Sequence, residues 1–459
     1  MHLTDKVGIE GNTFLVTGGL GFVGSALCEE LIRRGARKVR TLDTRTSSPW
    51  SENLKNIGVT LFQGKEMLQV GRINEVNING TCHVIDACLE YGVNRLVYVS
   101  TYNVVYGGKE IVNGNEDLPC FPMDDHGIID PYGRSKSIAE QLVLKSNASL
   151  SKKTDTLLYT CVIRPATIYG PGEERYLPWI VSLAKLGLFR FKIGDKRVKT
   201  DWVYLDNLVL ALILASMGLL DNIQRKEGSP VAAGQPYFIS DGLPVNTFEF
   251  IRPLLKSLEY DLPKATLTVS SALILGHILR NAYSFLFLWL NPSWLPRPLI
   301  LPTEVYKVGV THYFSILKAK EELGYVPLVS PEEGMSSTIT YWQERKRREV
   351  EGPTIYIWLL VVFDMWVMFC STCLPNIGPL KSIRSLSLFV FGSMKAVQIA
   401  YAISATAHVV EAIYAWYLAK RVDPENAKEW FWQTLHLGIF SLRFLLKRAW
   451  NGSISSLSI

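Results

Sequence analysis

The sequence predicts an α/β protein built on a doubly wound parallel sheet, with a small α/β lobe and a C-terminal helical membrane region. Three observations support this fold class. Residues 13–24 read TFLVTGGLGFVG, a short strand and a glycine-rich turn, and an amphipathic helix follows at 25–34. Short apolar strand runs then alternate with helical segments as far as residue 258, as in a parallel sheet with crossover helices. Long apolar stretches of spanning length begin only after residue 350.

The glycine-rich turn is predicted to bind the pyrophosphate of a dinucleotide. Gly18 can form the tight turn out of the strand, Gly21 leaves room for phosphate at the backbone, and Gly24 lets the helix pack closely on the strand. With Phe22 and Val23, these glycines surround the start of the helix, whose free N–H groups attract phosphate. A glycine-rich turn without a ligand is the alternative, but the flanking strand and helix favour a Rossmann dinucleotide site.

The choice of nicotinamide cofactor depends on the end of the second predicted strand. Residues 39–42 form this strand, and Asp43 follows it directly. An acidic side chain about 20 residues beyond the glycine loop suits a ribose 2′-hydroxyl. The sequence therefore favours NAD. Arg45 lies close enough along the chain to accept a 2′-phosphate, so NADP stays open as the alternative.

Composition and charge limit the expected partners and compartment. The chain has 459 residues, of which 48% are hydrophobic, and a net charge of +6. This charge is mild and dispersed, so nucleic acid is not an expected partner. The basic run at 345–348, directly before an apolar segment, is the exception. Seven cysteines without regular spacing indicate reduced, mostly buried thiols in a cytosol-facing protein. We predict no metal site and, from the polar N-terminus, no signal peptide.

The third predicted strand, residues 59–63, is followed by an unusually short connection. A doubly wound sheet needs a crossover helix and a fourth strand here, and the crossover alone takes at least about 10–12 residues. Residues 64–77 contain no apolar strand run, and the next segments are a helix at 75–91 and a strand at 96–99. One βα unit is therefore expected to be absent.

A tyrosine and a lysine four residues apart are the predicted catalytic pair. Tyr132 and Lys136 share one face of a helix predicted at 131–144. An ammonium beside a phenol lowers the phenol's pKa from about 10 toward working pH, so Tyr132 could exchange a proton with a substrate hydroxyl. The spacing alone is common by chance on a helix surface. Its place after a strand that ends in Ser100 and Thr101 favours the catalytic interpretation, because ligands bind outside the carboxyl ends of parallel strands.

Further strands complete the predicted sheet and begin the lobe. Residues 161–172 read as a buried strand closed by Pro and Gly turns, and it includes Pro165, which we assign to the cofactor site. A strand end runs into a helix at 201–214, another strand lies at 237–241, and a helix follows at 247–258.

Several of these segments together resemble one enzyme family. The chain is similar to the extended short-chain dehydrogenases, and within them to the 3β-hydroxysteroid dehydrogenase/isomerase family, its 42E branch and the sterol-4α-carboxylate 3-dehydrogenases. The resemblance covers about residues 10 to 345 and implies nicotinamide-dependent oxidation of a sterol or steroid 3β-hydroxyl. It rests on the glycine loop, Asp43, EVNINGT (75–81), VYVSTYNVVYGG (97–108), YGRSK (132–136), IRPATIYGPG (163–172), VYLDNLV (203–209) and THYFSILKAKEELGYVP (311–327).

The resemblance also implies a role for individual residues. Tyr132 is the proton donor or acceptor, and Lys136 binds the ribose and tunes Tyr132. Thr101, or less favourably Ser100, holds the substrate oxygen. Asn77 matches the Asn of the N-x-x-G-T helix, a structural or proton-relay position. Helix pairing into homodimers is common in the family.

One departure from the family puts activity in question. In the family the third strand is followed by an acidic turn, a helix and an apolar strand beside the cofactor, whereas here Gly64 runs straight into Lys65 and Glu66. The missing strand would lie next to the first one, under the dinucleotide. Two other interpretations are therefore kept: a non-catalytic membrane protein with a degenerate Rossmann domain, and a reductase or epimerase acting on another alcohol.

The last hundred residues are predicted to cross a membrane. Residues 354–374 are long enough to span, although Asp364 lies inside them, and 396–418 form a second span, with 430–446 as a shorter candidate. The basic run at 345–348 favours a cytosolic dehydrogenase domain, and the family favours the endoplasmic reticulum. We assign residues 10–235 to the NAD(P)-binding domain, 236–345 to an interleaved substrate lobe and 354–450 to the transmembrane region.

Two smaller features have alternative interpretations. The apolar stretch at 267–290 is either a lobe helix over the substrate pocket or a patch that touches the bilayer and admits a lipid substrate. His408 and Glu411 share one face of the second span, where they either hydrogen bond between helices or act in metal or proton chemistry.

Overall fold

The computed structural model describes residues 6–64, 73–121, 130–220, 228–287 and 301–457. By contacts within the chain these residues divide into two compact units. The first contains residues up to 177, 191–253 and 262–338, and the second contains 178–190, 254–261 and 339 onward. The first unit holds all the predicted site residues.

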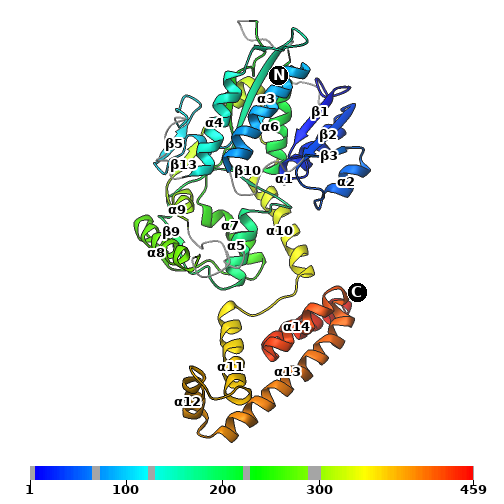
Figure 1. Cartoon of the computed structure of the whole chain (residues 1–459). Coiled ribbons are helices and arrows are strands. Elements are labelled where there is room, and N and C mark those ends of the chain that lie inside the picture. Colours follow the sequence, from blue (N-terminus) through cyan, green and yellow to red (C-terminus); the bar gives the residue numbers. More distant parts are fainter. Residues whose placement is uncertain (1–5, 65–72, 122–129, 221–227, 288–300, 458–459) are drawn as a thin grey trace. The chain divides into compact units, whose positions relative to one another are not determined.

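A small parallel sheet carries the glycine-rich turn (Figure 1). Its strand order is β1-β2-β3, and β2 ends at Asp43, opposite Gln63 of β3. All three predicted strands are confirmed to within a residue or two. The sheet and its helices comprise β1 (Thr13–Thr17), α1 (Phe22–Arg33), β2 (Lys38–Asp43), α2 (Ser51–Asn56) and β3 (Thr60–Gln63).

A second sheet carries the catalytic side of the site. Its strands run in the order β11-β7-β4, all parallel, with the short β6 antiparallel to the start of β7. The predicted strand at 161–172 is in fact two strands, because the chain leaves β7 after Pro165 and pairs again as β8 beside β10. The elements are η1 (Glu75–Asn79), α3 (Gly80–Tyr91), β4 (Arg95–Val99), η2 (Tyr102–Val104), α4 (Pro131–Lys145), β6 (Ser149–Leu150), β7 (Leu157–Pro165), β8 (Thr167–Tyr169), β10 (Trp202–Tyr204), α6 (Leu205–Gly218) and β11 (Gln235–Ile239).

The two sheets are not joined through hydrogen bonds between β1 and β4. Among the residues described, no strand lies between them. The strands flanking this interruption are less buried than central strands of a doubly wound sheet: Leu15 of β1 is 60% exposed, and β4 has no fully buried residue. This agrees with the prediction that one βα unit is absent. The short connection itself falls mostly on residues 65–72, which lie outside the described residues.

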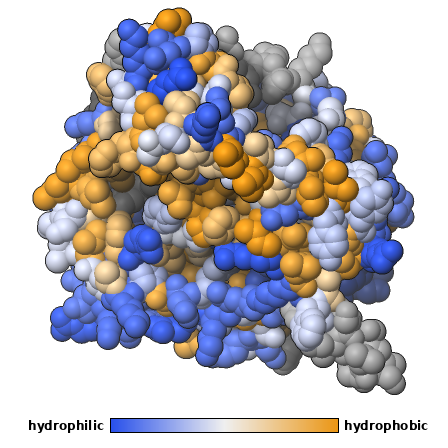
Figure 2. All heavy atoms as spheres, turned by 90° about the horizontal axis from the view of Figure 1, so that it is seen from below, coloured by the Kyte–Doolittle hydropathy of each residue, from blue (hydrophilic) through white to orange (hydrophobic). Residues whose placement is uncertain are grey.

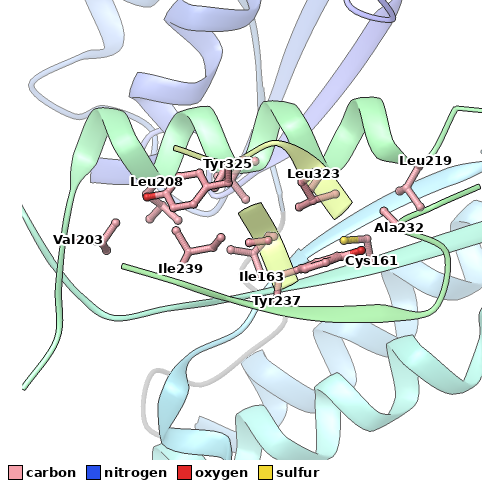
Figure 3. Packing of buried hydrophobic residues seen from close by; sticks show 14 of the residues in the cluster. Cys161, Ile163, Val203, Leu208, Leu219, Ala232, Tyr237, Ile239, Leu323 and Tyr325 are labelled. Atoms are coloured by element: carbon pink, nitrogen blue, oxygen red, sulfur yellow. The ribbon is translucent and has the colours of Figure 1, made fainter. Parts of the chain in front are cut away.

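Helices α1 and α6 cover one face of both sheets and hold the main core. Val16 and Leu20 pack with Ile213 and Met217 in one cluster, while α6 packs on β7 and β11 in another. Figure 3 shows this second cluster, with labelled side chains of α6, β7 and β11 filling the space between helix and strands. The first unit therefore keeps a continuous apolar layer behind an interrupted sheet.

The part of the chain predicted as the lobe contains short paired strands and several helices. Its two-stranded sheets are β13-β5 and β12-β9, both parallel. The predicted apolar helix at 267–290 is α8, and residues 288–290 lie outside the described part. The elements are β5 (Ile111–Gly114), α5 (Tyr176–Lys185), β9 (Lys192–Ile193), α7 (Thr247–Ser257), β12 (Thr266–Leu267), α8 (Val269–Phe287), α9 (Pro302–Gly309), β13 (His312–Phe314), η4 (Ala319–Leu323) and α10 (Pro331–Arg348).

The C-terminal part of the chain is entirely helical. Two helices, α11 and α13, are long and apolar enough to cross a membrane, and only 17% and 11% of their apolar windows are buried. A core helix of a soluble protein would be mostly buried, so this exposure favours a lipid environment. In Figure 2 hydrophobic residues are exposed in patches among hydrophilic ones. The helices are α11 (Ile355–Cys373), α12 (Leu380–Phe391), α13 (Met394–Val422), η5 (Pro424–Asn426), α14 (Ala427–Leu437) and α15 (Ile439–Leu457).

Glycines lie at two of the breaks between these helices, and one break falls inside the apolar stretch at 430–446 that was predicted as a candidate span. Gly392, at φ 76°, separates α12 from α13, and Gly438, at φ 57°, separates α14 from α15. The candidate third span is thereby broken into two helices, neither of which qualifies as a span. Near this break His408 Nδ1 lies 3.1 Å from the carbonyl oxygen of Leu435, a contact between helices as one interpretation expected.

Candidate functional site

The glycine-rich turn has the backbone geometry that phosphate binding needs. Gly18 has φ 70°, and its N–H donates to the carbonyl of Leu42 at 2.8 Å. A Cβ on Gly24 would collide with the carbonyl oxygen of Gly18, so α1 could not approach the turn if this residue had a side chain. Helix α1 begins at Phe22, with Gly21 as a cap that contributes no side chain. Its first N–H groups have no intrahelical acceptors and can serve an anion.

Asp43 holds this turn from the end of β2. Its Oδ2 accepts from the N–H of Leu20 at 3.0 Å, and its Oδ1 accepts from the N–H of Arg45 at 3.0 Å. The guanidinium of Arg45 forms an ion pair with Glu174, with 3.6 Å between Nη1 and Oε2. A carboxylate at this point would repel a 2′-phosphate and can accept a hydrogen bond from a ribose hydroxyl.

Helix α4 brings Tyr132 beside the end of β4. Asp130 caps the helix by accepting from the N–H of Tyr132 at 3.1 Å, and its other oxygen pairs with Lys307 at 3.2 Å. A Cβ on Gly133 would lie 2.8 Å from the carbonyl oxygen of Asn103, so the helix packs directly on η2. Gly133 is a positioning residue that our sequence analysis missed, although a glycine inside a predicted helix is a recognisable signal.

Lys136 is buried against the end of β4. Its ammonium donates to the carbonyl of Val99 at 3.0 Å and to Tyr98 Oη at 3.3 Å, and lies 4.8 Å from the centre of the Tyr98 ring. Burial, with the nearby charge of Arg175, lowers the pKa of Lys136 from 10.5 to about 8. The lysine is therefore held by strand β4, at a place where a ribose hydroxyl could replace one of its partners.

The prediction that Lys136 lowers the pKa of Tyr132 is wrong for the chain without ligands. Burial raises the pKa of Tyr132, and the charges of Arg175 and Lys307 oppose that shift only partly. The physical reason is desolvation of the phenolate, which sequence spacing cannot reveal. Sequence analysis also missed Arg175 and Lys307, which come from distant segments.

Ser100 and Thr101 have different environments. Ser100 Oγ donates to Glu140 at 2.5 Å, and Glu140 forms a fully buried ion pair with Arg164. The hydroxyl group of Ser100 therefore donates its proton to a buried internal partner, Glu140. Thr101 Oγ1 accepts from the N–H of Asn103 at 3.3 Å and keeps its own proton to donate. This difference favours Thr101 as the group that contacts a substrate oxygen.

Asn77 is connected to the start of α4 by hydrogen bonds through Ser135. Its Nδ2 donates to Ser135 Oγ at 2.8 Å, and Ser135 Oγ donates to the carbonyl of Tyr132 at 2.9 Å. Asn77 lies in η1, a π-helical turn, and its carbonyl accepts from Thr81 Oγ1 at 2.6 Å. π-Turns inside helices are frequent at functional sites. The geometry gives Asn77 a positioning role through Ser135.

Aromatic rings surround the turn after β4. Tyr106 stacks on His312 with ring centres 4.0 Å apart, and Tyr102 lies 5.1 Å from the same ring. Burial lowers the pKa of His312 to about 4, so the imidazole is neutral at physiological pH. Pro165 is buried at the end of β7, opposite Ile239. These rings form an apolar wall next to the predicted catalytic groups.

The predicted residues therefore form two groups. Gly18, Gly21, Gly24 and Asp43 lie with Phe22 and Val23 at the β1–β2 end, while Thr101, Tyr132, Lys136 and Asn77 lie with Pro165 at the β4–β7 end. The interruption between β1 and β4 falls between the groups. The residues present fit the adenosine diphosphate half of a dinucleotide and the groups expected around a nicotinamide, but the strand between them is lacking among the described residues.

Comparison with family models gives two matches. The model of the 3-beta hydroxysteroid dehydrogenase/isomerase family matches residues 15–65 and 60–269 as separate pieces. The junction between the pieces coincides with the short connection after β3. The model of transmembrane protein 254 matches residues 354–447, which contain α11, α12, α13 and α14.

Curated relatives extend the first match over most of the chain. Mouse short-chain dehydrogenase/reductase family 42E member 1 is 42% identical over 341 residues, covering 69% of this chain and 84% of the relative. The zebrafish protein of that name is 37% identical over 399 residues, covering 81% and 100%. Arabidopsis thaliana 3beta-hydroxysteroid-dehydrogenase/decarboxylase isoform 1 is 32% identical over 367 residues, covering 72% and 80%.

Solved structures share the fold at lower identity. The crystal structure of gox2253 has a TM-score of 0.54 at 21% identity and covers 74% of this chain and 100% of its own. A DesIV dTDP-glucose 4,6-dehydratase double mutant from Streptomyces venezuelae, with NAD and DAU bound, has a TM-score of 0.51 at 21% identity and covers 72% and 97%. These likenesses show a parallel-sheet Rossmann-like fold.

Proposed function

Because the chain belongs to the 3-beta hydroxysteroid dehydrogenase/isomerase family, we propose that it oxidises the 3β-hydroxyl of a steroid or sterol with NAD at a membrane. The observation that carries this proposal is the arrangement at the end of β4. There the ammonium of Lys136 donates to the carbonyl of Val99, two residues before Thr101, and helix α4, which carries Tyr132, packs directly on η2. The Arabidopsis relative is named as a 3beta-hydroxysteroid dehydrogenase and decarboxylase, which supports a sterol-like substrate.

Each residue has a definite task in this proposal. Thr101 donates a hydrogen bond to the substrate oxygen and fixes the alcohol beside Tyr132. Tyr132 acts in its phenolate form, taking the proton from that alcohol to become the phenol as hydride leaves the carbon. Lys136 holds the ribose, and the charges of Arg175 and Lys307 make the phenolate less costly. NAD, when bound along the glycine loop, would accept the hydride. Asp43 recognises the adenosine ribose and disfavours NADP.

The helical features of the chain are consistent with an apolar substrate. Ile274, Ile278 and Phe285 of α8 are 62%, 59% and 62% exposed and follow one side of the helix. Helix α8 packs against α9, which carries Lys307 next to the cap of α4. An exposed aliphatic stripe on a lobe helix suits contact with lipid. We propose that a sterol enters from the bilayer along this side.

The proposed membrane topology depends on two membrane-spanning helices, α11 and α13. The basic run at 345–348 precedes α11, and Lys420 and Arg421 lie in the last turn of α13. Both groups of basic residues would lie in the cytosol if α11 and α13 each cross the membrane once. We propose an endoplasmic reticulum protein whose dehydrogenase domain and C-terminus both face the cytosol. On this topology Asn451 stays unglycosylated.

The test is an assay of membranes containing the full chain, with NAD and a panel of 3β-hydroxysterols. Removing the Tyr132 hydroxyl by Tyr132→Phe should lower the rate at least about a hundredfold, since general acid–base catalysis typically contributes that much. The interruption between β1 and β4 favours a second candidate, a non-catalytic membrane protein. A wild-type rate equal to that of Tyr132→Phe would favour this second candidate.

A further inference from the structure

A shallow, open hollow that the dehydrogenase function does not use lies against helices α11 and α14. Its volume is about 450 Å³. Most of its lining lies on one side of α14, at positions four residues apart, and one tryptophan faces it from α11. The lining residues are Trp358, Lys428, Glu429, Trp432, Gln433 and His436.

The hollow combines aromatic rings with one charge of each sign. Trp358 stacks with His436 at a ring separation of 6.3 Å and an angle of 27°, and Trp432 is 51% exposed. Lys428 and Glu429 are exposed, and neither forms an ion pair within the described part of the chain. Aromatic faces attract organic cations, most strongly when the cation is a quaternary ammonium. The two free charges can serve a ligand that is itself zwitterionic.

The position of the hollow along the helices matches the edge of a bilayer. Trp358 lies in the first turn of α11, and α14 is joined to the end of α13 by the short helix η5. Gln433 Nε2 donates to the carbonyl of Glu351 at 2.8 Å, and Asn426 Nδ2 donates to the carbonyl of Arg348 at 2.6 Å. These bonds fix α14 beside the segment that precedes α11. If α11 and α13 cross the membrane, the hollow lies where headgroups begin.

We infer that this hollow binds the phosphocholine headgroup of a bilayer lipid. The trimethylammonium group would lie against Trp432 and Trp358, with Glu429 opposite its charge. Lys428 would pair with the phosphate. An anionic lipid would satisfy Lys428 but leave Glu429 facing a negative charge, and an ethanolamine lipid would offer a strongly hydrated ammonium with weaker attraction to the rings. The inference therefore predicts selectivity among headgroups, not only contact with lipid.

The experiment uses the full chain, purified in a maltoside detergent and mixed with equal amounts of phosphatidylcholine, phosphatidylethanolamine and phosphatidylglycerol with identical acyl chains. Native mass spectrometry then counts the lipids retained. Phosphatidylcholine should be retained in excess. Trp432→Ala and Glu429→Gln should each reduce that retention about two- to fivefold, the weight of one exposed cation–π or charge contact.

Matched controls separate this site from general lipid contact. Trp450, which is 71% exposed, and Glu425, which is exposed in η5, lie outside the hollow. Trp450→Ala and Glu425→Gln should leave the retention unchanged. Equal retention of the three lipids by the wild type would overturn the inference, as would equal losses in the hollow and control variants. All variants change surface residues, and an unchanged gel-filtration profile verifies that each one is folded.

Discussion

Lys136 offers the sharpest physical test of the site, because its charge is buried. The pKa of Lys136 falls from 10.5 to about 8 in the folded chain. Between these values the unfolded chain keeps a proton that the folded chain has lost, so the free energy of unfolding rises with pH. The slope is at most about 1.4 kcal/mol per pH unit, and because both titrations are gradual the free energy of unfolding rises by about 2 kcal/mol between pH 8 and pH 10. Below pH 8 both states hold the proton and the slope disappears.

Lys136→Met removes this titration, so the wild type should gain about 2 kcal/mol of stability relative to the variant as the pH rises from 8 to 10. Urea unfolding of the detergent-solubilised proteins, followed by circular dichroism at each pH, measures the difference. Other groups titrate in this range, but they are common to both proteins and cancel. Lys145→Met, at the exposed end of the same helix, is the control and should show no such trend. A difference for Lys136→Met that is flat between pH 8 and pH 10 would refute the assignment of a buried, desolvated lysine.

Three further outcomes follow from individual contacts. Gly133→Ala should cost about 1–3 kcal/mol of stability in thermal unfolding, because its Cβ would lie 2.8 Å from the carbonyl of Asn103; a neutral result would mean that α4 does not rest on η2. Asp43→Asn should weaken NAD binding about tenfold by titration calorimetry, as one charge-assisted hydrogen bond is lost, and an unchanged affinity would remove Asp43 from the ribose site. Glu140→Gln leaves Arg164 buried without its counter-charge and should cost about 3–5 kcal/mol; a loss below 1 kcal/mol in urea unfolding would show that the ion pair is not buried in solution.

The local parts of the site could be predicted because sequence-local rules determine them. Three glycines between a strand and a helix have few roles other than binding a dinucleotide. Residue 24 has to be glycine, because a Cβ at this position would collide with the backbone of Gly18. The place of Asp43 at the end of β2 could be predicted, because it directly follows the residues of the predicted strand in the sequence. A helix start at Asp130 and Pro131 is an ordinary cap signal. The interruption of the sheet could also be predicted, because residues 64–77 are too few for a crossover of at least about 10–12 residues together with a further strand.

Features that depend on distant segments could not be predicted. Arg175 lies in a loop and Lys307 in α9, each more than forty residues from Tyr132 along the chain, so the effect of their charges on Tyr132 could not be anticipated. The raised pKa of Tyr132 depends on burial, which no spacing encodes. Gly438 adopts a left-handed φ value that ends a helix inside the apolar run at 430–446, and composition alone suggested a continuous segment there.

The central claim is that the glycine loop and the Tyr132–Lys136 pair act as one NAD site despite the interruption between β1 and β4. Titration calorimetry of the purified full chain with NAD tests it most directly, with Gly24→Val as the variant whose side chain closes the loop. We expect saturable binding of micromolar affinity by the wild type and none by the variant. No saturable binding by the wild type, or equal binding by both proteins, would contradict the claim.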